Sequence, residues 1–314
     1  LPKKQINFIK DEIIEINYND NFVTTKSEDI SFDFLIISMG AVLAPEKIPG
    51  LVENGFNLYD HNQLDEIHHK LDKIESGKIA IVIMAMPYKC PPAPFEASLL
   101  VDSMLRKRGI RDSIQIDFYS PAPITLPAAG PEVSKKILDL VNSEKITFHN
   151  SKKIIRVEPK KLIFENDEYS FDILLAIPPH TAPKVIYDSN LAKEPGFIPI
   201  NRDCKTPHEN IFAVGDVTSL VVTDSMAVPK AGVFAEGEGI AVAKNIVSKL
   251  LSKEPSVLFD GKGGCFLESG RDTASTIEVD MFADPKPSTR LTESTKDNLS
   301  KKLDFEKERL SKWL

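Results

Sequence analysis

The stretch Asn210-Ile211-Phe212-Ala213-Val214-Gly215-Asp216-Val217 decides the fold, because an apolar run ends abruptly in a glycine and an aspartate. The run predicts a buried strand, and the Gly-Asp pair predicts a turn at the strand's carboxyl end. Gly215 lets the backbone come close to a ligand, and Asp216 places a carboxylate where open α/β sheets bind their ligands. The spacing by itself leaves a ligand site and an ordinary Asp-capped turn equally open.

The composition is that of an ordinary globular chain, with 314 residues, of which 42% are hydrophobic and 27% charged. This length suits about two domains. The net charge of -7 and the pI of 5.5 argue against a general nucleic-acid partner. No apolar run reaches the roughly 18 residues that span a bilayer, and no signal peptide is visible. We therefore expect a cytoplasmic chain.

The pattern of an apolar strand that stops at a turn occurs at two further places. Residues 31–41 stop at Gly40, and residues 171–178 repeat the Phe-Asp start of residues 32–33. This internal repeat predicts an α/β fold of two related three-layer dinucleotide-binding-type domains, the second inserted in the first, plus a small C-terminal α+β region. The expected ranges are 1–47 with 190–254, then 48–189, and finally 255–314.

The periodicity of apolar residues predicts most of the remaining elements. Strands are expected at residues 6–9, 13–18, 22–25, 79–84, 114–119, 146–148, 154–157 and 162–164, and in the region 255–292. Residues 48–76 are expected to be mostly helical, and further helices are expected at residues 97–108, 133–141, from 228 to about 251, and 294–314. The inward-facing residues of the helix at residues 97–108 are expected to be Leu99, Leu100, Met104 and Leu105. On the last helix, one face is expected to hold Leu299, Leu303, Leu310 and Trp313.

The loop after the strand at residues 79–84 differs from a nucleotide-binding loop. A dinucleotide-binding unit would carry G-x-G-x-x-G here. The chain instead reads Ala85-Met86-Pro87-Tyr88-Lys89-Cys90-Pro91-Pro92-Ala93-Pro94-Phe95-Glu96, with no glycine. Its four prolines lack the N–H groups that would cradle a pyrophosphate. We therefore predict a nucleotide-binding shape that does not bind NAD(P)H strongly.

The three cysteines, Cys90, Cys204 and Cys265, are widely separated and form no CxxC pair, so no metal site is predicted. From the residues alone, Cys90 and Cys265 are either a reactive pair or two unrelated buried thiols. Cys204 lies in a polar loop and is interpreted as a bystander.

Four segments, taken in order and spacing, resemble the sulfide:quinone oxidoreductase and flavocytochrome c sulfide dehydrogenase flavoprotein family. They are residues 32–41, residues 88–96, residues 210–217 followed by 229–236, and residues 264–268. The most specific of them is YKCPPAPFE at residues 88–96, because relatives that use NADH carry glycines there. Met39 departs from the family pattern, in which threonine is usual.

The resemblance implies an FAD-dependent oxidoreductase that oxidises sulfide, or a related small thiol, and delivers the electrons to a quinone. It implies a redox-active disulfide between Cys90 and Cys265, which hydrosulfide opens. It also implies that Asp216 hydrogen-bonds the ribityl chain of FAD and that Lys230 supports the electron-rich edge of the flavin. The other residues expected near the cofactor are Gly40, Gly215, Ala231 and Gly232.

Two further residues have competing interpretations. Glu96 is expected to be a general acid or base beside Cys90, and the alternative is an ordinary glutamate in the first turn of a helix. His180 is expected to assist quinone or proton handling, although a surface-loop histidine is the favoured alternative.

Two alternatives for the whole chain stay open. One is a flavoprotein subunit that passes electrons to a cytochrome. The other, from a different class, is a degenerate fold that acts as a binding module. It stays open because the family's amino-terminal βαβ unit, which holds the FAD pyrophosphate, is missing. We expect that the sequence is a fragment that begins downstream of this unit. The charged C-terminal helix either docks on the protein body or makes peripheral contact with a membrane. A homodimer is also left open.

Overall fold

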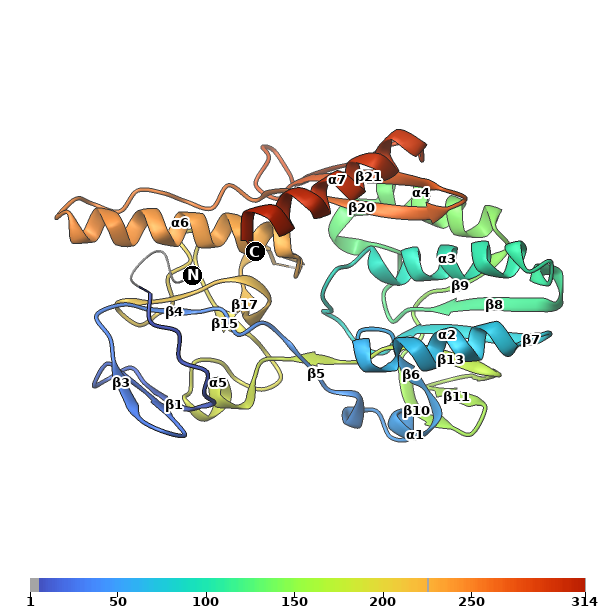
Figure 1. Ribbon diagram of the computed structural model, residues 1–314, viewed down its shortest axis with the longest axis horizontal. Coiled ribbons are helices and arrows are strands. Elements are labelled where there is room, and N and C mark those ends of the chain that lie inside the picture. Colours follow the sequence, from blue (N-terminus) through green and yellow to red (C-terminus); the bar gives the residue numbers. More distant parts are fainter. Residues whose placement is uncertain (1–5, 225, 314) are drawn as a thin grey trace. The chain divides into compact units, whose positions relative to one another are not determined.

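The computed structural model describes residues 6–224 and 226–313 and divides them into two compact units. Unit 1 holds the described residues up to Val42, then Thr181–Val221 and Glu238–Phe259. Unit 2 holds Leu43–His180, the described part of Val222–Gly237, and the described part of Asp260–Leu314. Each unit mixes strands and helices, as the predicted α/β class requires (Figure 1).

A parallel sheet of five strands forms the centre of unit 2, in the order β6-β13-β7-β8-β9. The strands are β6 (Phe56–Asn57), β7 (Gly77–Ile83), β8 (Ile114–Tyr119), β9 (Ile146–His149) and β13 (Ile173–Ile177). All five residues of β13 are buried, as are the last five of β7. Burial on both faces explains why these strands read as continuous apolar runs in the sequence.

The longer helices of unit 2 pack their apolar stripes against this sheet and the nearby strands. They are α2 (Leu64–Lys73), α3 (Ala93–Lys107) and α4 (Gly130–Ser143), with the short helix α1 (Leu51–Asn54). On α3, Leu99 and Leu105 are buried as expected, and Phe95 stacks on Phe118 of β8 with ring centroids 4.6 Å apart. Leu100 was wrongly expected to face inward, since successive helical residues point about 100° apart and the face of Leu99 is the buried one.

A three-stranded antiparallel sheet occurs once in each unit and confirms the predicted internal repeat. In unit 1 it is β1 (Ile13–Asn17), β2 (Phe22–Thr25) and β3 (Asp29–Ser31); in unit 2 it is β10 (Ile154–Glu158), β11 (Lys161–Phe164) and β12 (Glu168–Ser170). The two sheets share strand order, burial pattern and a register shift in the first strand. The strand expected at residues 6–9 is wrong, because a strand needs a pairing neighbour, which β-rich composition does not supply.

Unit 1 contains the strand that leads into Gly215 and Asp216. This strand, β16 (Ile211–Ala213), pairs in parallel with β4 (Leu35–Ile37). Unit 1 also contains the pair of β15 (Ile198–Pro199) with β17 (Thr218–Ser219) and helix α5 (Lys184–Asp188). The pair of β18 (Val221–Thr223) with β19 (Met226–Ala227) belongs to unit 2 except for Val221. In the pair of β5 (Val42–Leu43) with β14 (His180–Thr181), each strand has one residue in either unit, and helix α6 (Gly232–Leu250) begins in unit 2 and continues in unit 1 from Glu238.

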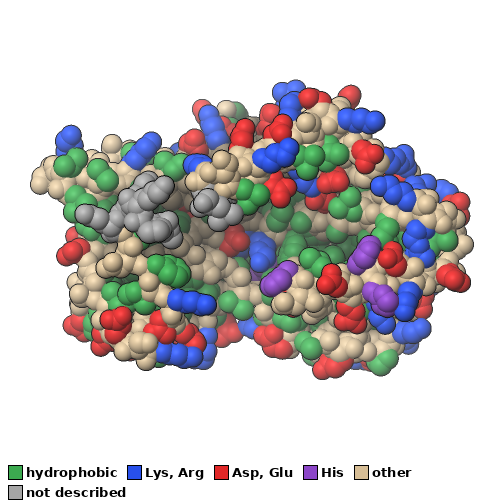
Figure 2. All heavy atoms as spheres, in the orientation of Figure 1, with side chains coloured by type: hydrophobic (Ala, Val, Ile, Leu, Met, Phe, Trp, Pro, Cys, Tyr) green, Lys and Arg blue, Asp and Glu red, His purple; other side chains and the backbone are tan. Residues whose placement is uncertain are grey.

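The end of the chain adds a second, antiparallel sheet to unit 2. Its strands are β20 (Lys262–Gly270), β21 (Thr273–Asp280) and β22 (Ser288–Leu291), and α7 (Lys296–Trp313) packs against β21 and β20. Helix α3 lies between β20 and the parallel sheet (Figure 1). Acidic and basic side chains are interspersed over the face shown in Figure 2.

The leucines of α7 do not form its buried face. Leu303 is 48% exposed and Leu310 is 50% exposed, and the side chain of Trp313 lies outside the described part. Lys302 and Phe305 face inward instead, because the surface below presents carboxylates and the ring of Phe266. Within residues 6–224 and 226–313, no helix combines the length and the apolar content needed to cross a bilayer.

Candidate active site

The loop that carries Cys90 is held by hydrogen bonds from distant parts of unit 2. The Cys90 N–H donates to the carbonyl oxygen of Lys230 at 2.7 Å. The Tyr59 hydroxyl donates to the carbonyl of Lys89 at 2.8 Å and to that of Cys90 at 3.4 Å. Cys90 has a φ of 50°, a left-handed conformation that few non-glycine residues adopt. The surrounding contacts therefore hold Cys90 in a strained backbone shape, as often occurs at functional sites.

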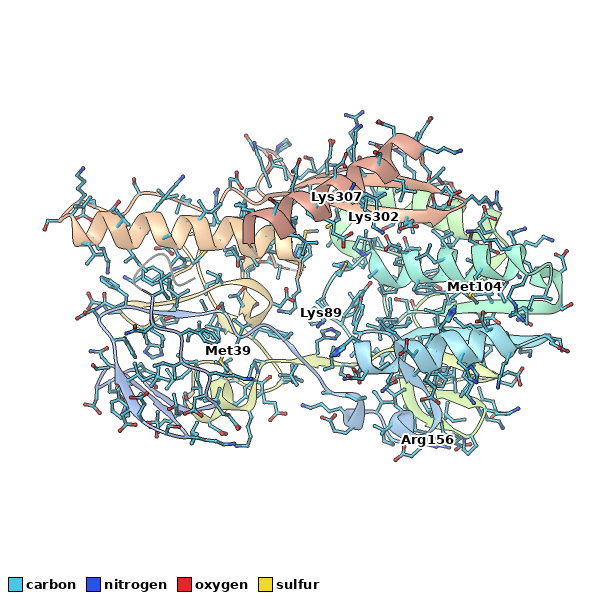
Figure 3. The ribbon with its side chains drawn as sticks, in the orientation of Figure 1. Met39, Lys89, Met104, Arg156, Lys302 and Lys307 are labelled. Carbon is cyan, nitrogen blue, oxygen red and sulfur yellow. The ribbon has the colours of Figure 1, made fainter. Side chains whose placement is uncertain are left out.

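Tyr59 is half-buried and remains a hydrogen-bond donor over the working pH range. Burial raises its pKa well above the ordinary value of 10.0, and the negative charge of Cys90 adds to this effect. The Lys89 ammonium lies 5.9 Å from the centre of the Tyr59 ring (Figure 3). No sequence pattern pointed to Tyr59, which lies in a turn far along the chain from the cysteine loop.

Cys265 lies on β20 and faces Ile277 of β21 in the register of the antiparallel sheet. The structure holds Cys90 and Cys265 as thiols, the first exposed and the second half-buried. Burial raises the pKa of Cys265 to about 11, and the charges of Cys90 and Glu96 raise it further in the same direction. The two cysteines are therefore close enough to influence each other electrostatically.

An apolar pocket of about 420 Å³, counting its open mouth, lies beside Cys265. It is lined by residues from the cysteine loop, from the segment before α6 and from β20, among them Pro91, Pro92, Pro229, Ala231, Phe234 and Cys265. The cysteine loop and the Cys265 strand thus meet at one hollow.

Glu96 lies in the first turn of α3, and both of its carboxylate oxygens are hydrogen-bonded. One accepts the Glu268 N–H at 2.7 Å, and the other accepts from the Lys302 ammonium at 3.0 Å (Figure 3). Lys302 also pairs with the Glu268 carboxylate at 2.7 Å. Glu96 therefore ties α3 to β20 and α7 next to Cys265, and its role as an acid or base stays a prediction. Lys302 was missed because its partners lie far away in the sequence.

His180 is buried, with 5% of its surface exposed, so the favoured account of a surface-loop histidine is wrong. Its Nδ1 lies 2.9 Å from the Pro178 carbonyl, which can only accept, so Nδ1 carries the proton. Within the described part of the chain, Nε2 has no hydrogen-bond partner. Burial lowers the pKa of His180 to about 4, and the charges of Lys89 and Lys230 also lower it. The imidazole is neutral at pH 7, and its role in quinone or proton handling stays a prediction.

The residues expected at the cofactor divide between the two units. Gly40 and Gly215 follow the parallel strands β4 and β16 in unit 1, with φ of 68° and 77°, and Asp216 comes directly after. The Gly215 N–H donates to the buried Glu238 carboxylate at 2.6 Å, a contact the sequence did not suggest. Lys230, Ala231 and Gly232 belong to unit 2, together with Cys90, Glu96, His180 and Cys265. Cys204 is buried in unit 1, where its carbonyl accepts the Ala213 N–H at 3.1 Å.

Comparison with known proteins shows which families of enzymes this chain resembles. Residues 115–240 match the family described as pyridine nucleotide-disulphide oxidoreductase. The sulfide-quinone reductase of Aquifex aeolicus is 28% identical over 305 residues, which cover 91% of this chain and 69% of that protein. The mitochondrial sulfide:quinone oxidoreductase of Dictyostelium discoideum is 27% identical over 241 residues, 71% of this chain and 53% of that protein. A type II NADH:quinone oxidoreductase of Staphylococcus aureus is 21% identical over 277 residues.

The solved structure of the sulfide:quinone oxidoreductase from Aquifex aeolicus superposes with a TM-score of 0.89 at 26% identity, covering 99% of this chain and 76% of that chain. The chain is therefore similar over residues 115–240 to the pyridine nucleotide-disulphide oxidoreductases. Over most of its length it is also similar in sequence and fold to sulfide:quinone oxidoreductases. The chain spans about half the length of the Dictyostelium relative.

Proposed function

We propose that the chain is an FAD-dependent oxidoreductase that oxidises sulfide through Cys90 and Cys265 and delivers the electrons to a quinone. One observation carries this proposal: the fold brings the cysteine loop and the Cys265 strand to one apolar hollow, with the two sulfurs electrostatically coupled. The similarity to sulfide:quinone oxidoreductases supports the same activity.

The loop of unit 2 argues against NADH as the electron donor. Its prolines remove N–H groups where a nucleotide-binding loop would present them to a pyrophosphate. The backbone N–H of Cys90 donates to the Lys230 carbonyl, so it does not point toward a pyrophosphate. We therefore prefer sulfide to NADH as the donor, although a type II NADH:quinone oxidoreductase is among the relatives.

The residues of unit 1 fit part of a flavin cofactor. Gly40 and Gly215 bend the chain at the carboxyl ends of two neighbouring parallel strands, which is where open α/β sheets bind ligands. A Cβ added at Gly40 would meet no atom within 4 Å, so the glycine leaves room for a close ligand. We propose that Asp216 binds the polyol of FAD there.

In unit 2, Lys230 and the start of α6 are the candidates for the flavin ring. Lys230 is 6% exposed, and its backbone is tied to the cysteine loop by the bond to Cys90. A Cβ at Gly232 would meet nothing within 4 Å. We propose that the Lys230 cation stabilises negative charge on the reduced ring. When bound, FAD would take up the electron pair released at the cysteines and pass it to the quinone.

The chemistry begins from a disulfide between Cys90 and Cys265. Hydrosulfide attacks one sulfur, a new S–S bond forms as a persulfide, the old S–S bond breaks, and the electron pair leaves on the other sulfur. A sulfur whose pKa is raised to about 11 is a poor leaving group, which favours attack at Cys265 with Cys90 leaving. Cys90 lies just before the amino end of α3, where the helix dipole favours negative charge.

Sulfide-dependent bleaching of bound flavin tests the activity. The purified chain is reconstituted with FAD without oxygen, given sulfide, and then given a short-chain quinone. We expect bleaching followed by recovery, with both steps abolished by Cys90→Ser or Cys265→Ser and retained by Cys204→Ser, since Cys204 is buried in unit 1. Bleaching that survives Cys90→Ser would contradict the proposal.

A second measurement needs no flavin. The oxidised chain is treated with sulfide, trapped with an alkylating agent, and analysed as peptides by mass spectrometry. We expect a persulfide on the peptide that contains Cys265. The absence of both a Cys90–Cys265 disulfide and a persulfide would refute the proposed sulfur chemistry.

A further inference from the structure

The two elements that carry the reactive cysteines pack directly on each other in unit 2. Cys90 lies just before the start of α3, and Cys265 lies on β20. Alternate side chains of a strand point to the same face, so Cys265 shares a face with Leu267. Leu267 is buried, and it belongs to the same apolar core as Phe95 and Leu99 of α3. The face of β20 that holds Cys265 therefore packs against the helix that follows the cysteine loop.

Glu96 links these two elements at the edge of the antiparallel sheet. In the order β20-β21-β22, β20 pairs with β21 on one side and forms the edge on the other. At this edge the Glu268 N–H donates to one oxygen of the Glu96 carboxylate at 2.7 Å. Glu96 lies in the first turn of α3, and Glu268 follows Cys265 on the same strand. The bond therefore fixes the spacing between the two elements that carry the cysteines.

A lysine of α7 reinforces this link. The Lys302 ammonium binds the second oxygen of Glu96 at 3.0 Å and the Glu268 carboxylate at 2.7 Å (Figure 3). Burial opposes the charge of Lys302, but the hydrogen bonds to Glu268 and Glu96 outweigh it and raise the pKa of Lys302. The ammonium is therefore charged at neutral pH. One cation thus joins a carboxylate from α3 to a carboxylate from β20.

Removing this cation would leave the Glu96 and Glu268 carboxylates facing each other, and like charges repel. The side chains of Lys302, Glu96 and Glu268 are each less than a third exposed, so water screens the repulsion only in part. The repulsion would act between α3 and β20. A disulfide needs its two Cβ atoms about 4 Å apart, so a small separation of these elements would already hinder it.

We propose that Lys302 is a positioning residue for the two cysteines: with Glu96 and Glu268 it forms a clamp that holds α3 and β20 where the Cys90 and Cys265 sulfurs can pair. The proposal rests on the proposed function, in which these sulfurs form a disulfide. The clamp restricts the reduced chain, so less freedom is lost when the disulfide closes. Lys302 itself touches neither substrate nor cofactor in this account.

The redox equilibrium with glutathione tests the proposal without flavin and without sulfide. In the full chain with Cys204→Ser, the Cys90 and Cys265 thiols transfer two electrons and two protons to oxidised glutathione. The Cys90–Cys265 disulfide forms, and the S–S bond of glutathione breaks to give two reduced molecules. Alkylation and mass spectrometry measure the disulfide fraction over a series of glutathione ratios. The result is the effective concentration of one thiol toward the other.

We expect Lys302→Met to lower this effective concentration about fivefold, which is the scale of a partly exposed ion pair. Lys302→Arg retains the cation and should keep the parent value. Adding Glu268→Gln to Lys302→Met removes the repulsion and should recover most of the loss. Lys307→Met is the matched control and should change nothing, because Lys307 lies on the same helix but is 76% exposed and pairs with Asp304 at 3.9 Å (Figure 3).

An effective concentration that Lys302→Met leaves unchanged, or that Lys307→Met lowers equally, would overturn the proposal. A second measurement needs no substitution on α7, in case Lys302→Met does not fold. Sodium chloride at about 1 M screens the ion pairs of the parent and should lower its effective concentration. A parent value that this salt leaves unchanged would also count against the clamp.

The same experiment separates the clamp from the proposed function. A disulfide that forms in the parent but does not respond to Lys302 refutes the clamp and leaves the proposed function standing. A disulfide that responds as expected, in a chain without sulfide-dependent bleaching, leaves the clamp standing and refutes the proposed function. A parent that forms no Cys90–Cys265 disulfide at any glutathione ratio refutes both.

Discussion

The raised pKa of Cys265 predicts an unusually slow thiol at neutral pH. Its pKa lies at about 11 instead of 9.0, with burial as the first cause and the charges of Cys90 and Glu96 as the second and third. At pH 8 this shift reduces the thiolate fraction about 100-fold, since each pKa unit is a factor of ten. Removing the charge of Cys90 or of Glu96 should lower the pKa of Cys265 and accelerate its alkylation at neutral pH. Burial is unchanged in both variants, so neither should restore the ordinary value completely.

The assay is the pH dependence of alkylation by iodoacetamide, followed on the Cys265 peptide in a Cys204→Ser background. We expect a midpoint near pH 11, lowered by Cys90→Ser and, to a smaller extent, by Glu96→Gln. Glu132→Gln is the matched control, because Glu132 also lies in the first turn of a helix of unit 2 but is paired with Lys136 on the surface. A midpoint near 9 in the parent, or no change with Glu96→Gln, would show that the electrostatic reasoning is wrong.

Three further predictions follow from single contacts. His180 is neutral in the folded chain and takes up a proton below pH 6.5 in the unfolded chain. The free energy of unfolding should therefore fall by about 3 kcal/mol as the pH falls from 6.5 to 4. Urea unfolding at several pH values should show this fall in the parent chain and not in His180→Phe. Gly263→Ala forces Phe234 to move and should lower the thermal midpoint, whereas Gly264→Ala should leave it nearly unchanged. Tyr59→Phe leaves the Lys89 carbonyl without its hydroxyl donor and should lower the free energy of unfolding by about 1 kcal/mol. Urea unfolding followed by far-UV circular dichroism measures this change, and an unchanged unfolding midpoint would argue against this bond.

Much of the fold was predictable because its signals are local. The apolar runs of β7 and β13 are long enough to show that both faces are buried. The Phe-Asp pairs at residues 32–33 and 171–172 predicted an internal repeat. The matched three-stranded antiparallel sheets of the two units confirm this repeat. Local signals failed where a face had to be chosen. On α3, Leu100 was expected to face inward but is exposed. On α7, Leu303 and Leu310 are exposed, whereas Lys302 faces the carboxylates of Glu96 and Glu268.

The sequence by itself determined the chemical elements of the site: a proline-stiffened cysteine loop, the Gly215-Asp216 turn, and a cysteine preceded by two glycines. These depend on residue types and on neighbours within a few positions. Only the tertiary structure decided what surrounds them. Segments far apart in the chain create four of these surroundings: the hydrogen bond from Tyr59, the ion pairs of Lys302, the burial of His180 and the open space at Gly264. Periodicity and propensity describe one segment at a time, whereas these contacts arise only when packing brings distant segments together.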